Sequence, residues 1–340
     1  MADYTVLKNA NLAVNLDIAV LLAEASQAAY GRIGPDDPSA DDTVDSPAQW
    51  AAKTGFDAVN TFDNNNLQGF WCVHDEVALL AFRGTSNPRQ WIRDARFFPA
   101  PYPWGRLHVG FRNGVNAHTA DLRKFMNAAA AGSAAFVWMT GHSLGGALAV
   151  ISASKLTLLG PPAVVPPRVY TYGQPRVGLS GFAERFKQEF PERLVRFINE
   201  DDIVPRVPPI FQHTGLPKHI IRPGVLELAM AENAPALSDE QSERFAALQR
   251  ACARVPGAVV PESMAEVAPD ASPRLIDDEP QALTPQQFAD LQYGLGATPA
   301  PQEGASAAES VPEGAISIPA FDDHAIGNYI QRLKELAATA

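Results

Sequence analysis

The residues best suited to chemistry form the pentapeptide GHSLG at residues 141–145. A serine in the pattern G-x-S-x-G is typical of a sharp strand-to-helix turn that lifts its hydroxyl above a sheet. An apolar run at 134–139 precedes the pattern, and a stretch rich in Ala and Leu follows it. The sequence therefore predicts Ser143 as a nucleophile and Leu144 as a backbone N–H donor to the developing oxyanion. The alternative is a glycine-rich turn whose serine does no chemistry.

A serine hydroxyl becomes a good nucleophile when a histidine takes its proton and a carboxylate orients that histidine. In folds with this turn, the acid and then the histidine follow the serine along the chain. The apolar run 194–198 ends in Glu200, Asp201 and Asp202, and loops after parallel strands build the sites of such sheets. We choose Asp202 as the orienting acid, although spacing alone does not separate it from Asp201, and a solvated turn carboxylate is the alternative.

Three histidines lie beyond these carboxylates, namely His213, His219 and His324. His213 and His219 follow a Pro-rich turn by few residues, so either would need a short loop to reach back to the serine. His324 opens a C-terminal helical pattern, and a histidine at such a junction can overhang a sheet. We choose His324 as the general base, and the residues alone leave the other two open.

Strand and helix patterns alternate through most of the chain before residue 221. Residues 31–50 are polar and rich in Pro, Asp and Ser, which predicts a loop. The alternation, with strands apolar on both faces, predicts a mainly parallel sheet covered by helices. The predicted strands are 77–82, 134–139, 169–172 and 194–198, and the predicted helices are 15–30 (amphipathic), 112–131, 144–159, 181–190 and one in the C-terminal segment after residue 325.

The composition changes after residue 221. Residues 256–319 hold ten prolines, too many for further alternating core elements. Two short helices are nonetheless predicted by patterns that resemble capping boxes, one headed by Ser238 and one by Thr284. We interpret 221–315 as an insertion or cap, partly helical and partly mobile, in a single domain with its core at 15–220 and 316–340.

The whole-chain composition limits the classes of partner. A net charge of −11 on 340 residues argues against nucleic-acid binding, which needs a positive surface. No spacing suggests a metal site or a cofactor, and Cys72 and Cys252 are interpreted as two buried free thiols rather than a disulfide. The first residues lack the pattern of a secretory signal, and no apolar run is long enough to span a membrane. We expect a cytoplasmic protein or the mature form of an exported one.

Further motifs appear in one order along the chain. They are AFRGTS at 81–86, WIRD at 91–94, HVGF at 108–111, GHSLGGALA at 141–149, YGQPRVG at 172–178, NEDDIVPRVPP at 199–209, and DH at 323–324 with Tyr329. In this set and order, the chain resembles the class 3, fungal-type triacylglycerol lipases of the α/β-hydrolase superfamily. The resemblance covers 15–220 and 316–333, and it implies an α/β-hydrolase fold.

The resemblance also implies roles for individual residues. It implies Ser143 as nucleophile, Asp202 as orienting acid and His324 as general base, with His213 a non-catalytic histidine of the Asp202 region. It implies Thr85 as the second oxyanion donor. It implies a mobile lid over 87–93 that includes Trp91, and Phe97, Phe98, Tyr102 and Trp104 could extend an aromatic wall toward lipid. The alternative is that these aromatics only pack their loop onto the core.

Together these features predict a serine ester hydrolase, foremost a lipase that cleaves acylglycerols and meets a lipid interface transiently. A phospholipase, a short-chain carboxylesterase or a polyester hydrolase on the same site are alternatives within the enzymes. A catalytically silent hydrolase fold, whose insertion binds a partner protein, is the alternative outside them. The long span between Asp202 and His324 leaves the rim of the acyl groove open.

Overall fold

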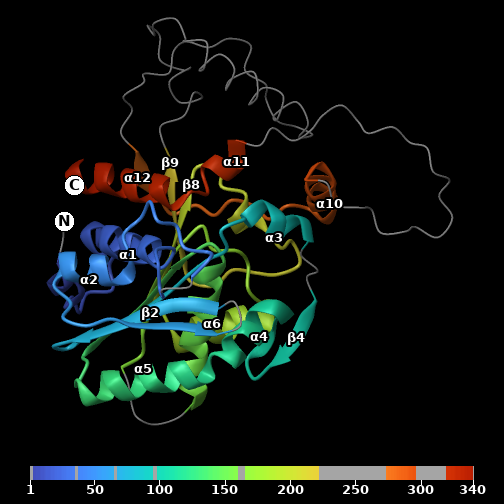
Figure 1. The fold of residues 1–340 in the computed structure, drawn as a ribbon. Coiled ribbons are helices and arrows are strands. Elements are labelled where there is room, and N and C mark those ends of the chain that lie inside the picture. Colours follow the sequence, from blue (N-terminus) through green and yellow to red (C-terminus); the bar gives the residue numbers. More distant parts are fainter. Residues whose placement is uncertain are drawn as a thin grey trace, which may run out of the picture.

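An eight-stranded sheet forms the centre of the structure (Figure 1). The computed structural model describes residues 3–34, 37–64, 67–94, 98–159, 165–221, 273–295 and 319–339. The five strands from β3 to β9 pair in parallel, and the antiparallel pair β1–β2 and the short β10 complete the two edges. In sheet order the strands are β1 (Asn60–Asn64), β2 (Leu67–His74), β3 (Val77–Phe82), β6 (Phe136–His142), β7 (Arg168–Tyr172), β8 (Leu194–Asn199), β9 (Leu216–Ile221) and β10 (Arg274–Ile276).

The strand β3 illustrates why helices cover both faces of this sheet. All its side chains are buried. Leu79 and Ala81 belong to one apolar cluster, whereas Leu80 and Phe82 belong to another. Successive side chains of a strand point to opposite faces, so a strand that is apolar throughout needs a cover on each side.

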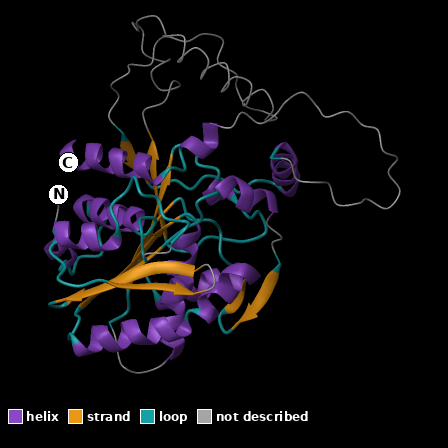
Figure 2. Cartoon of the chain, viewed as in Figure 1, coloured by secondary structure: helices purple, strands orange, loops and turns teal. Residues whose placement is uncertain are grey.

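The two layers of helices supply these covers (Figure 2). One layer consists of η1 (Tyr4–Leu7), α1 (Leu16–Ala28), α2 (Pro47–Thr54) and α12 (Ile326–Thr339). The other consists of α4 (Val109–Ala117), α5 (Thr119–Ala131), α6 (Leu144–Leu159) and α7 (Ser180–Glu189), with the hairpin β4 (Pro99–Tyr102) and β5 (Gly105–His108) beside them. In the first layer, α1 and α12 come from opposite ends of the chain and pack side by side.

Most predicted elements are present, and three differ from the prediction. The helix predicted at 112–131 is two helices that meet at His118, whose buried ring packs 4.0 Å from the ring of Phe62. The loop predicted at 31–50 ends early, because Ser46 and Gln49 form a capping box that starts α2. The helix α1 is not amphipathic but buried almost all round, since it lies between the sheet and α12.

Part of the predicted insertion is described. The helix α10 (Pro285–Gly294) begins where the sequence predicted, and Thr284 and Gln287 form its reciprocal capping bonds. It packs against α3 (Pro88–Asp94), and α11 (Pro319–Asp322) precedes the C-terminal helix (Figure 1). The helix predicted after Ser238 lies outside the described residues, as does most of the proposed insertion.

Two further observations concern single elements. Cys72 is a buried free thiol on β2, and burial raises its pKa, whereas Cys252 lies outside the described residues. None of the helices in the described ranges is both long enough and apolar enough to cross a membrane.

Candidate active site

The GHSLG segment forms a strand-to-helix turn between β6 and α6. Ser143 has a φ of +57°, a conformation that is uncommon for a non-glycine residue and is found at strained functional turns. Its N–H donates to the carbonyl oxygen of Tyr172 over 2.8 Å. A Cβ at Gly141 would overlap the backbone of Gly145, so the tightness of the turn explains the glycine there. The turn expected from the sequence is therefore present.

Asp202 and His324, which are 122 positions apart in the sequence, are hydrogen-bonded to each other. His324 Nδ1 lies 2.8 Å from Asp202 Oδ2, and both side chains are buried. The hydroxyl of Tyr329 donates to Oδ2 over 2.7 Å and the Val204 N–H donates to Oδ1 over 2.9 Å, so the carboxylate is held from three directions. Because a carboxylate accepts hydrogen bonds, Nδ1 carries the proton and Nε2 is left as an acceptor.

The other carboxylates and histidines that the sequence left open have different surroundings. Asp201 is exposed, and Glu200 pairs with Arg332 over 2.9 Å. The Nε2 of His213 donates to the backbone carbonyl oxygen of Pro205 over 2.7 Å, and the Nε2 of His219 donates to the backbone carbonyl oxygen of Glu200 over 2.8 Å. Burial lowers the pKa of His213 well below its usual value, and the nearby positive charge of Arg196 adds to this effect. Both histidines thus hold the loop after β8 in place through hydrogen bonds to its backbone.

Ser143 Oγ and His324 Nε2 are buried, and neither has a hydrogen-bond partner among the described residues. Ser143 and His324 nevertheless lie on neighbouring segments of the structure. A Cβ at Gly173, which follows Tyr172, would lie 2.7 Å from His324 Nδ1 and 2.7 Å from Asp202 Oδ2. The structure therefore joins Asp202 to His324 directly and leaves the serine hydroxyl unbonded. In unliganded enzymes the hydrogen bond between a catalytic serine and its histidine is often long, and it shortens when substrate binds.

The two proposed oxyanion donors, Thr85 and Leu144, are half-buried. Leu144 is the first residue of the 16-residue helix α6, whose N-terminus favours negative charge. Thr85 follows Gly84, where an added Cβ would lie 3.2 Å from the Cβ of Ser143. The Thr85 hydroxyl accepts the N–H of Asn87 over 3.2 Å. The loop after β3 and the start of α6 thus meet beside the serine.

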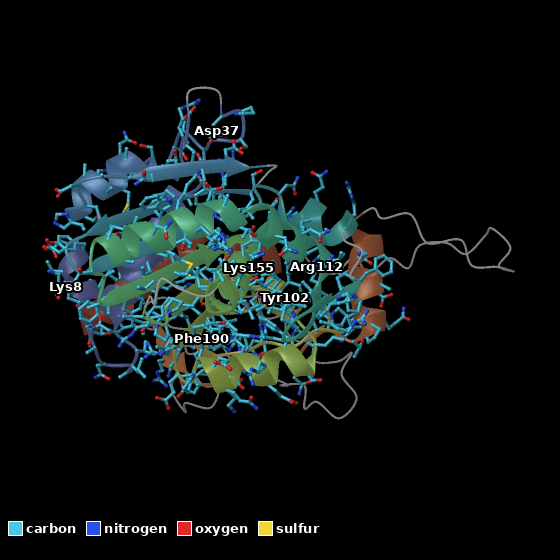
Figure 3. All side chains as sticks on the ribbon, turned by 90° about the horizontal axis from the view of Figure 1, so that it is seen from below. Lys8, Asp37, Tyr102, Arg112, Lys155 and Phe190 are labelled. Atoms are coloured by element: carbon cyan, nitrogen blue, oxygen red, sulfur yellow. The ribbon has the colours of Figure 1, made fainter. Side chains whose placement is uncertain are left out.

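Arg83 fixes the loop that carries Thr85. Its Nη1 lies 2.9 Å from Asp37 Oδ2 in a buried ion pair, and its Nη2 donates to the carbonyl oxygen of Tyr30. Burial by itself raises the pKa of the Asp37 carboxyl, but hydrogen bonds from Ser39 and Arg83 outweigh it and lower the pKa to about 2. Asp37 lies on the loop between α1 and α2, close to β2 (Figure 3). This anchor was not predicted from the sequence.

The aromatic segment after α3 is less open than the predicted lipid-facing wall. Trp104 is 9% exposed and packs against the phenylalanines of α7, and the Tyr102 hydroxyl lies 2.9 Å from Ser154 Oγ. These two side chains therefore pack the β4–β5 hairpin onto the core. Phe98 is 63% exposed, Trp91 on α3 is half-buried and stacks on Phe111, and Phe97 lies outside the described residues.

The comparisons with known proteins agree with this architecture. A family model described as lipase (class 3) matches residues 79–212. The secreted mono- and diacylglycerol lipase 1 of Fusarium solani is 32% identical over 182 residues, 52% of this chain and 50% of the relative. The lipase of Rhizomucor miehei is 35% identical over 161 residues, 42% of this chain and 41% of the relative. The chain thus spans half or less of the length of these curated relatives.

A shorter match and the solved structures complete the comparison. The chloroplastic phospholipase A1-Igamma1 of Arabidopsis thaliana is 37% identical over 91 residues, 25% of this chain and 18% of the relative. A solved triacylglycerol lipase whose catalytic centre is described as a serine protease triad is 26% identical, with a TM-score of 0.52 over 60% of this chain and 80% of that one. A Rhizomucor miehei lipase–propeptide complex also gives a TM-score of 0.52 at 26% identity, over 60% of this chain and 66% of that chain. Over residues 79–212 the chain is similar to the class 3 lipases, and it has the α/β-hydrolase fold.

Proposed function

We propose that this chain is a serine carboxylic ester hydrolase that cleaves acylglycerols through a covalent acyl-enzyme. The observation that carries this proposal is the buried pair of Asp202 and His324, joined at 2.8 Å, with the acceptor nitrogen Nε2 left unbonded. Ser143 supplies the hydroxyl that would donate to this nitrogen. It lies on the turn between β6 and α6, where its φ is positive. The match of residues 79–212 to a class 3 lipase family model supports the same chemistry.

In the proposed first step, Ser143 Oγ attacks the ester carbonyl carbon and its proton passes to His324 Nε2. Asp202 stabilises the imidazolium that forms, because Nδ1–H already donates to the carboxylate. The carbonyl electrons move to oxygen, where the backbone N–H groups of Thr85 and Leu144 are the proposed donors. When the C–O bond breaks, the alcohol leaves with the proton from Nε2 and the acyl group stays on Oγ.

Water then repeats the sequence on the acyl-enzyme. His324 Nε2 takes a proton from the water molecule, and the hydroxide attacks the acyl carbon. Collapse of this second intermediate returns the proton from Nε2 to Ser143 Oγ and releases the carboxylic acid. Tyr329 contributes by donating to Asp202 Oδ2, which holds the carboxylate in register with Nδ1.

The substrate class we propose first is acylglycerol, because the longer matches are to proteins named lipase or mono- and diacylglycerol lipase. A phospholipid substrate is the second candidate, and the match to a phospholipase A1 favours it. We keep 15–220 and 316–340 as the proposed catalytic core, with 221–315 as an insertion beside the site. The half-buried Trp91 on α3 is the proposed lid residue that meets a lipid interface.

A fluorophosphonate probe tests the reaction class. We expect stoichiometric labelling of Ser143, found by mass spectrometry of the tryptic peptide, and none in Ser143→Ala. A chain that stays unlabelled and hydrolyses no ester would instead be a silent hydrolase fold. The substrate class follows from initial rates on emulsified acylglycerol, on phosphatidylcholine vesicles, on p-nitrophenyl esters of increasing chain length and on a polyester film. Acylglycerol is expected to rank first, and a sharp rate increase is expected above its solubility limit.

A further inference from the structure

The histidine beside the nucleophile, His142, has no part in the proposed reaction, yet it is buried in the middle of the site. Its Nδ1 lies 2.9 Å from the Tyr30 hydroxyl, and its Nε2 lies 2.6 Å from the backbone carbonyl oxygen of His324. The rings of His142 and His324 have centroids 4.5 Å apart. The ring of His142 thus bridges the N-terminal part of the chain and the turn that carries the proposed general base.

The partners of His142 determine where its proton lies. A carbonyl oxygen only accepts hydrogen bonds, so Nε2 is the protonated nitrogen and Nδ1 is the acceptor. The Tyr30 hydroxyl must therefore donate to Nδ1. A Cβ at Gly84 would overlap this hydroxyl, which explains why the loop needs a glycine here.

The direction of these bonds connects three parts of the site. They run from the Tyr30 hydroxyl, which packs against Gly84 next to Thr85, through His142 to the carbonyl oxygen of His324. Side chains and a backbone turn from distant parts of the sequence are thereby held together. A cationic His142 would repel the imidazolium that forms on His324 during the reaction. Burial lowers the pKa of His142 well below its usual value, and the nearby charge of His324 adds to this, so the ring stays neutral.

We infer that Tyr30 and His142 are positioning residues, which hold the backbone of His324 and the Gly84–Thr85 loop in register with Ser143. The inference rests on the proposed function, because it assigns Tyr30 and His142 to the same reaction. The two residues touch no substrate atom. They act through the placement of the general base and of the oxyanion donor, and misplacement by about 1 Å can cost about a hundredfold in rate.

The first variants are Tyr30→Phe and His142→Leu, each assayed on a soluble p-nitrophenyl ester. We expect kcat to fall by roughly tenfold in Tyr30→Phe and roughly a hundredfold in His142→Leu, with KM unchanged within about twofold. A loss confined to kcat reports geometry at the reacting atoms. Tyr170→Phe is the control, because it removes the same hydroxyl from a buried tyrosine whose ring packs against Trp138 on the sheet. Its kcat should equal that of the unmodified chain.

Two further variants separate positioning from general packing. In His142→Gln a side-chain amide can still donate to the His324 carbonyl, so most of the activity lost in His142→Leu should return. The double variant Tyr30→Phe/His142→Leu should be no slower than His142→Leu alone, because the second change removes the bond that the first would break. Additive losses, or a Gln variant as slow as the Leu variant at equal melting temperature, would overturn the inference.

The outcome for the unmodified chain distinguishes this inference from the proposed function. A chain that neither reacts with the fluorophosphonate probe nor hydrolyses ester removes the proposed function itself. An active chain whose Tyr30→Phe and His142→Leu variants both fold and keep full kcat removes only the positioning role. If His142→Leu does not fold, the comparison of Tyr30→Phe with Tyr170→Phe still decides the question.

Discussion

Two neighbouring regions of the site are held together by different forces. In the polar region, directional hydrogen bonds join buried side chains. The Asp202 carboxylate, for example, accepts hydrogen bonds from His324, from Tyr329 and from the Val204 N–H. In the apolar region, the contacts are hydrophobic and join α3, α10, α11 and the turn η2 (Val204–Arg206). This region consists of Ile92, Ile203, Val204, Val207, Leu283, Phe288, Leu291 and Phe321, with Trp91 and Leu295 packed against them.

Polar contacts also join elements of the apolar region. Gln292 Nε2 donates to the carbonyl oxygen of Ile92 over 2.9 Å, and the guanidinium of Arg89 lies 5.1 Å from the centre of the Phe321 ring. Hydrogen bonds lose strength steeply with angle, whereas hydrophobic burial has no preferred direction. The hydrogen bonds of the polar region therefore hold His324 in one orientation, whereas the hydrophobic contacts of α3 and α10 impose no preferred direction.

The largest effect is expected in the polar region, where the proposed reaction takes place. Ser143→Ala removes the nucleophile, and we expect kcat to fall by roughly 10⁶-fold, as for other serine triads. Initial rates on a soluble p-nitrophenyl ester measure this loss. Retention of more than a few per cent of kcat in a preparation free of other esterases contradicts the assignment of Ser143.

Asp202→Asn is expected to lower kcat by roughly 10⁴-fold, because an amide at this position no longer holds His324 in the tautomer with a proton on Nδ1. Asp201→Asn is the matched control. Asp201 is the neighbouring residue and is exposed, so its change should leave kcat within about twofold. Equal losses in the two variants would show that the loop after β8 tolerates neither change and that the bond to His324 is not the cause.

A smaller effect is expected in the apolar region. Leu291→Ala removes buried contacts between α10 and its neighbours, which costs about 2–3 kcal/mol where the site cannot collapse. We expect amide hydrogen exchange in 88–94 and 285–294 to become roughly tenfold faster or more, with little change elsewhere. Gln286→Ala, on the exposed side of α10, is the control. Uniform acceleration across the sheet would mean that the two regions unfold as one unit.

The sequence predicted the parts of the molecule that depend on neighbouring residues. The limits of β3 and α6 follow from continuous apolar runs and from the small residues of the turn, which are local signals. The turn at Ser143 was found in the same way. The capping pattern at Ser46 is equally local, so the start of α2 is predictable from the sequence as well.

Other parts of the site could not be predicted from local patterns. The residues alone favoured His324 but left His213 and His219 open. They favoured Asp202 without separating it from Asp201, and the family resemblance implied both choices. The pairing of Asp202 with His324, 122 positions apart, depends on how the sheet and α12 pack. A short stretch of sequence does not contain that information. The docking of α10 on α3 and the bonds of Tyr30 to His142 are of the same kind.

The smallest expected effect concerns Asp323, which precedes His324 at the edge of the polar region. Burial raises the pKa of its carboxyl to about 6, the negative charge of Glu200 adds to this, and Arg332, 3.6 Å away, opposes it. The charged form is thus disfavoured in the folded state. The folded protein holds this proton more tightly than the unfolded chain, so stability falls as pH rises from about 4 to 6, and the full cost is present above 6.

Asp323→Asn removes this charge while it keeps the shape of the side chain. We expect the free energy of unfolding to rise by about 1–2 kcal/mol at pH 8 and by less at pH 4.5, where the carboxyl is largely protonated in the folded state. Urea unfolding at the two pH values measures the difference. A gain that is equal at both pH values would instead reflect packing of the amide, and a loss at pH 8 would show that the attraction of Arg332 outweighs burial and the repulsion of Glu200.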